Sequence, residues 1–121
     1  MGLDMYVYAT ATRTPAVDFP EPADAELLHS WRKHHRLHHW MSLLYRTLGG
    51  AKKAFNLTAV VIDDDTLDYL ADDILHDRLP DKPICFLGHG DADRKDDDLA
   101  FVAKARAALE RGLTVYYIPS W

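Results

Sequence analysis

The chain has 121 residues, of which 48% are hydrophobic and 27% are charged, and its formal net charge is −5. This length and composition are typical of one packed domain spanning residues 1–121, and they argue against a disordered or fibrous protein. The single cysteine, Cys85, excludes an intrachain disulfide, and no apolar run is long enough for a membrane span or a secretion signal. We therefore expect a cytoplasmic protein that does not enter membranes.

The first half of the chain predicts one strand and one long helix. Residues 3–10 are rich in β-branched and aromatic side chains in alternation, which predicts a strand. A proline-rich connection follows. Asp24 then resembles a helix N-cap, and apolar or aromatic residues recur every three or four positions until Gly49 and Gly50. This pattern predicts a helix of about 24 residues over 24–48.

The second half predicts alternating strands and helices. Strands are expected over residues 56–62, 84–87 and 113–118, and helices from Asp63 or Asp65 to Leu75 or Leu79 and from Asp96 to Arg111. The element order is then β-α-β-α-β-α-β. This order predicts an α/β (α+β) domain in which helices pack on one face of a four-stranded sheet.

Charge is distributed unevenly along the chain. Residues 25–53 contain six Lys and Arg, one Glu and five histidines, whereas residues 62–98 contain thirteen Asp and four Lys and Arg. The basic segment favours an anionic ligand or an acidic partner, although it is also compatible with a solvated helix face. The tracts Asp63–Asp65 and Asp96–Asp98 each precede a predicted helix, and we interpret them as helix caps.

Residues 31–40 form the densest cluster of functional side chains. On a helix, aromatic rings would lie beside cations, an arrangement that can neutralise a phosphate and stack on a base. His38 would be a polar ring on the apolar face, so it needs either a backbone carbonyl as partner or a ligand. The predicted ligand-binding residues, which include aromatic residues of the C-terminal strand, are Trp31, Arg32, Lys33, His38, Trp40, Tyr116, Tyr117 and Trp121.

A metal site is a weaker candidate. His34 and His38 are four residues apart and would share one face of a helix, but no third ligand is evident and no H-E-x-x-H motif supplies a base. If Asp91 and Asp93 contributed carboxylates, the protein could be a metal-dependent hydrolase. We predict no catalytic residue and no cofactor.

Several motifs together resemble a family of small proteins encoded by phages and prophages. They are Met1–Tyr6, Trp31-Arg32-Lys33 followed by Leu37-His38 and Trp40, Leu79-Pro80 before Phe86-Leu87-Gly88, and the ending Tyr116-Tyr117 with Ser120-Trp121. Here Pro119 stands where relatives have a serine. The resemblance implies a role in a bacterial host, such as countering host defence.

The sequence therefore predicts a binding protein that captures a phosphate-bearing, nucleotide-like small molecule and does not read duplex DNA. The alternative is a protein–protein inhibitor, with a basic helix or an acidic surface that docks on a host defence protein. The metal-dependent hydrolase is the third hypothesis, and association of identical chains stays open.

Overall fold

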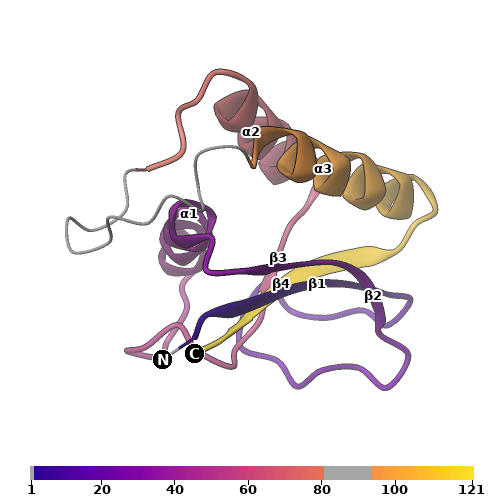
Figure 1. Cartoon of the computed structure of the whole chain (residues 1–121). Coiled ribbons are helices and arrows are strands. Elements are labelled where there is room, and N and C mark those ends of the chain that lie inside the picture. Colours follow the sequence, from indigo (N-terminus) through magenta and orange to yellow (C-terminus); the bar gives the residue numbers. More distant parts are fainter. Residues whose placement is uncertain (1, 81–93) are drawn as a thin grey trace.

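The computed structural model describes residues 2–80 and 94–121. Its elements in chain order are β1 (Asp4–Thr10), β2 (Glu26–Arg32), α1 (His35–Thr47), β3 (Val60–Val61), α2 (Asp64–Leu75), α3 (Lys95–Glu110) and β4 (Thr114–Ser120). The strands form one antiparallel sheet in the order β2-β1-β4-β3, and the helices lie on one side of it (Figure 1). The predicted α+β class and four-stranded sheet are confirmed. Each helix in the described ranges is too short or too polar to cross a membrane.

The sheet is packed on both faces because its side chains alternate. On β1, Met5 and Val7 point toward the helices and join the main core, where Tyr117 of β4 lies opposite Val7. Tyr116, the neighbouring residue on β4, points to the other face and packs there with Phe19 of the connection between β1 and β2. Tyr116 and Tyr117 therefore belong to two separate apolar clusters.

The predicted helix over residues 24–48 is wrong in its first third. Residues 26–32 form β2, and helix α1 covers only His35–Thr47. A spacing of four positions, as between Leu27 and Trp31, matches one side of a regular strand as well as of a helix, so the pattern alone fits both. In β2 the register shifts opposite Val7 and Tyr8, so Trp31 pairs with Met5 and Leu27 pairs with Tyr8, on opposite faces of the sheet. Strand β2 supplies the hydrogen-bond partner for one edge of β1, and Lys33 ends it with a positive φ of 58°.

Asp24 accepts hydrogen bonds within a loop and does not form the N-cap of a helix. Its carboxylate accepts hydrogen bonds from the hydroxyls of Thr10 and Thr12 and from the backbone N–H of Ala11. These donors lower the pKa of Asp24 below its usual value, the Thr10 hydroxyl most strongly. The side chain expected to start a helix thus closes the connection between β1 and β2.

The second half of the chain follows the prediction more closely. Helices α2 and α3 and strand β4 are confirmed, and Asp63 caps α2 by accepting from the N–H of Thr66 at 2.8 Å. The predicted strand over 56–62 is reduced to Val60–Val61. The predicted strand over 84–87, with Cys85, lies outside the described residues. The described elements follow the order β-β-α-β-α-α-β, and because β2 comes directly after β1, the predicted strict alternation is wrong.

Replacement of Gly50 by alanine is expected to destabilise the fold by about 1–3 kcal/mol. A Cβ at Gly50 would lie 2.2–2.4 Å from ring carbons of Tyr45, which is fully buried and donates from its hydroxyl to Asp18 at 2.6 Å. Urea unfolding of Gly50→Ala measures the change. Gly2→Ala is the matched control, because a Cβ there meets nothing within 4 Å. Equal stability of the two variants would contradict this packing.

Candidate functional site

Three polar side chains from separate elements meet in the core beneath α3. Asp98, in the first turn of α3, accepts a hydrogen bond from Nε1 of Trp31 on β2 at 3.0 Å. Its other carboxylate oxygen lies 2.8 Å from Nε2 of His34, the residue before α1. The side chains of His34 and Asp98 are only 2% and 3% exposed. These contacts join β2, α1 and α3 at one buried point, which we call the Trp31–Asp98–His34 triad.

The triad leaves one polar atom of His34 unsatisfied. An ionised carboxylate only accepts hydrogen bonds, so Nε2 of His34 carries the hydrogen and donates the hydrogen bond to Asp98. Nδ1 of His34 is buried and has no hydrogen-bond partner among residues 2–80 and 94–121. A buried polar atom without a partner costs about 1–3 kcal/mol, so such an atom requires an explanation, for example a ligand.

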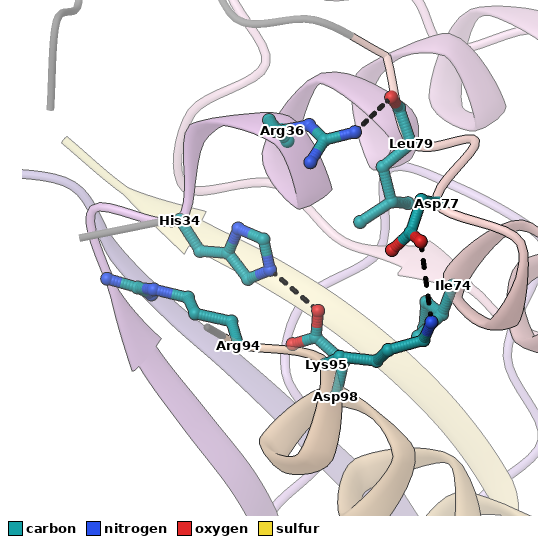
Figure 2. A pocket seen from close by; sticks show the side chains of 8 residues that line it. All are labelled: His34, Arg36, Ile74, Asp77, Leu79, Arg94, Lys95 and Asp98. Atoms are coloured by element: carbon teal, nitrogen blue, oxygen red, sulfur yellow. Dashed lines mark hydrogen bonds and ion pairs between the residues drawn. The ribbon is translucent and has the colours of Figure 1, made fainter. Parts of the chain in front are cut away.

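His34 lines a small cavity between the starts of α1 and α3. The cavity measures about 40 Å³, and Figure 2 shows the side chains around it. This space suffices for water or for the charged end of a larger ligand. We call it the His34 cavity, and its lining residues are His34, Arg36, Ile74, Asp77, Leu79, Arg94, Lys95 and Asp98.

Positive charge predominates around the His34 cavity. Three cations, Arg36, Arg94 and Lys95, face two carboxylates, Asp77 and Asp98. Arg36 donates to the carbonyl of Leu79 at 2.8 Å, and Arg94 donates to the carbonyl of Arg32 at 2.8 Å. Because the carbonyl of Leu79 is neutral, it orients the Arg36 guanidinium without cancelling its charge. The Nζ atom of Lys95 lies 3.4 Å from a carboxylate oxygen of Asp77, and both side chains are exposed.

Two helix N-termini adjoin the same cavity. His34 is the N-cap residue of the 13-residue helix α1, and Arg94 is the N-cap residue of the 16-residue helix α3. Helix α1 has no acidic residue in its first turn and no side-chain cap. The partial positive charge of this terminus is therefore not offset by a side chain of the first turn of α1, which favours an anion there.

The structure does not bring the predicted cationic and aromatic stripe together. Trp31 is buried toward the helices, whereas Arg32, its neighbour on β2, is exposed and pairs with Asp4 of β1 at 3.1 Å. Lys33 is exposed in the turn between β2 and α1. Adjacent residues of a strand point to opposite faces, so Trp31 and Arg32 cannot hold one ligand as they would on a helix.

His38 has a partner inside the protein. Its Nδ1 lies 2.8 Å from the hydroxyl of Tyr117, and its ring stacks on Phe55 with centroids 5.5 Å apart. The reading of His38 as a hydrogen-bonded core residue fits this geometry, with a tyrosine hydroxyl in place of the expected backbone carbonyl. Burial lowers the pKa of His38 to about 4, with smaller contributions from His35 and His39.

The remaining aromatic candidates lie apart from one another. Trp40 donates from Nε1 to Asp73 of α2 at 2.9 Å, and Trp121 donates to the carbonyl of Phe55 at 2.8 Å. Tyr116 lies on the face of the sheet opposite the helices, near Glu21. Of the predicted ligand-binding residues, only Trp31 therefore belongs to the triad, where its Nε1 donates a structural hydrogen bond to Asp98.

The metal site lacks the expected geometry in the described part of the chain. His34 precedes α1 and binds Asp98, while His38 lies within α1 and binds Tyr117, so their rings have different partners. No group of three or more His, Cys, Asp or Glu that could hold a metal ion occurs among the described residues. Asp91 and Asp93 lie outside them.

The sequence prediction missed Asp98, Arg36 and Lys95 as site residues. Asp98 was assigned to a capping tract, yet it lies three, four and seven positions before the buried residues Phe101, Val102 and Ala105. A carboxylate on the apolar stripe of a helix was therefore the available signal. Comparison of the chain with known protein families, curated proteins and solved structures gives no significant match, so the interpretation of the site rests on its geometry.

Proposed function

We propose that the protein binds an anionic, phosphate-bearing small molecule whose charged group enters the His34 cavity. The observation that carries the proposal is that His34 lines this cavity and that its buried Nδ1 atom has no hydrogen-bond partner among the described residues. The class of ligand is the same as the one predicted from the sequence. The proposed binding site is different: it is the cavity between α1 and α3 instead of the stripe around Trp31 and Arg32.

The chemistry of the cavity suits an oxyanion. When the His34 ring is protonated, Nε2 donates to Asp98 and Nδ1 donates to an oxygen of the ligand. When the ring is neutral, Nδ1 accepts from a protonated oxygen such as that of a hydrogen phosphate. Arg36 and the N-terminus of α1 supply further positive charge. The small volume admits the phosphate and leaves the remainder of the ligand outside.

The resemblance to phage and prophage proteins implies a biological role for such a ligand. A phage protein could capture a nucleotide that the bacterial host uses as a defence signal, and this role would require binding and no catalysis. This role is part of the proposal and remains a prediction. The ligand screen therefore starts from inorganic phosphate and proceeds to linear and cyclic nucleotides.

A ligand for the His34 cavity is expected to raise the melting temperature, by an amount that grows with its concentration. His34→Gln should weaken binding roughly 10- to 100-fold, because a charge-assisted hydrogen bond contributes about 1.5–3 kcal/mol. Glutamine removes Nδ1 and places an amide near the position of Nε2, from which it can donate to Asp98 and preserve the fold. Thermal shift and calorimetry with phosphate, AMP, ATP and cyclic nucleotides measure both effects.

Arg32→Ala is the matched control for this experiment. Arg32 is an exposed cation on β2 whose side chain pairs with Asp4 outside the His34 cavity. Its removal should leave affinity unchanged. If no probe stabilises the protein at low salt, the proposal fails. If Arg32→Ala abolishes binding while His34→Gln does not, the ligand binds elsewhere.

A further inference from the structure

An open groove runs between α1 and α2, away from the residues that line the His34 cavity. Its volume is about 370 Å³, and its lining combines residues of both helices with Leu48, the C-cap residue of α1. Leu43 is 52% exposed and Tyr69 is 73% exposed, although both are large apolar or aromatic side chains. The full lining is Trp40, Leu43, Leu44, Thr47, Leu48, Thr66 and Tyr69.

Acidic side chains border this groove on the side of α2. Helix α2 contains five Asp and no Lys, Arg or Glu. Asp65, Asp68 and Asp72 line an adjoining hollow together with Tyr69, the residue that also lines the groove. The apolar and the acidic surfaces are therefore continuous through Tyr69. We call this combined surface the α1–α2 groove.

Part of the acidic charge is not neutralised by the residues that the structure describes. Asp68 pairs with Arg106 of α3, and Asp72 pairs with Arg78. Asp64 and Asp65 have no ion-pair partner within the described ranges. Trp40, which also lines the groove, is held by its hydrogen bond to Asp73. The surface is thus an apolar strip that includes one fixed aromatic ring and has an acidic border.

We propose that the α1–α2 groove docks a basic amphipathic α-helix of a protein partner. Such a helix presents apolar anchors at positions i, i+3, i+4 and i+7, which fit an apolar groove between two helices. Lysine and arginine beside these anchors complement the Asp side chains of α2. Leu43 and Tyr69 contact the anchors, and Asp65 contacts the basic border of the partner. This interaction is independent of the His34 cavity.

The test uses a fluorescein-labelled Leu/Lys peptide of 14 residues with leucines at the anchor positions i, i+3, i+4 and i+7 of one helical face and lysines on the opposite face. A scrambled peptide of equal composition and a peptide with Glu in place of each Lys are the peptide controls. Fluorescence anisotropy should show saturable binding of the amphipathic basic peptide alone. Asp65→Asn should weaken this binding and reduce its dependence on salt, whereas Glu110→Gln, at the far end of α3, should not.

The apolar contribution is tested by Leu43→Ala combined with Tyr69→Ala, which should lower affinity at least tenfold. Leu27→Ala is the matched control, because Leu27 on β2 is equally exposed, at 51%. Both groove positions are exposed, so circular dichroism should show an intact fold. Equal binding of the scrambled peptide, or no effect of the double substitution, would overturn the proposal. Self-association that the double substitution abolishes, without peptide binding, would identify a second copy of the chain as the occupant and would also overturn it.

Discussion

Asp98→Ala is expected to destabilise the protein by about 3–5 kcal/mol, the largest effect that we predict for a single substitution. The carboxylate of Asp98 is almost fully buried and accepts from both Trp31 and His34. Alanine would leave two buried N–H donors without an acceptor and would open a space at the start of α3. Because native domains are stable by about 5–15 kcal/mol, this loss would approach the unfolding of the whole fold.

More conservative substitutions separate the contributions of the Trp31 and His34 hydrogen bonds to this loss of stability. Asp98→Asn keeps an oxygen that can accept from Trp31, so it should cost less than Asp98→Ala. Trp31→Phe removes one donor and should leave the contact between His34 and Asp98 in place. Urea unfolding, monitored by circular dichroism because Trp31 is itself a fluorophore, provides the free energies. A loss of less than about 1 kcal/mol for Asp98→Ala would show that the triad does not stabilise the fold.

The sequence predicted those elements whose local signals were unambiguous. Asp63 is followed by an apolar helical pattern with no competing interpretation, and α2 forms as expected. The segment around Trp31 was ambiguous, because its four-residue spacing suits a strand and a helix alike. What decided between them was the open edge of β1, which requires hydrogen bonds from residues 26–32. That requirement is tertiary and is not visible in the segment itself.

The candidate site was hidden for the same reason. His34 and Asp98 are 64 positions apart, and they meet only because α1 and α3 both begin at one end of the structure. Arg36 was visible as a basic residue of the histidine-rich segment, but its position at a cavity depends on the segment after α2, which brings the carbonyl of Leu79 to Arg36. Local charge in the sequence therefore led to the prediction of an anionic ligand, and the fold determines which cations line the candidate cavity.

Acidification should weaken the fold through His38, by about 2–3 kcal/mol between pH 7 and pH 4. Burial lowers the pKa of His38 from 6.5 to about 4, so over this range the unfolded chain binds a proton that the folded protein excludes. The free energy of unfolding therefore increases as the pH rises from about 4 to 6.5.

His38→Asn supplies the matched control, since asparagine does not titrate and its amide oxygen can accept from the Tyr117 hydroxyl. Other acid-sensitive groups are common to both proteins and cancel in the comparison. Urea unfolding at intervals between pH 4 and pH 7.5 should show a stability difference between the two proteins that shifts in favour of His38→Asn as the pH falls. A difference independent of pH would mean that the folded protein accepts a proton at His38 without penalty, contrary to its contacts with Phe55 and Tyr117.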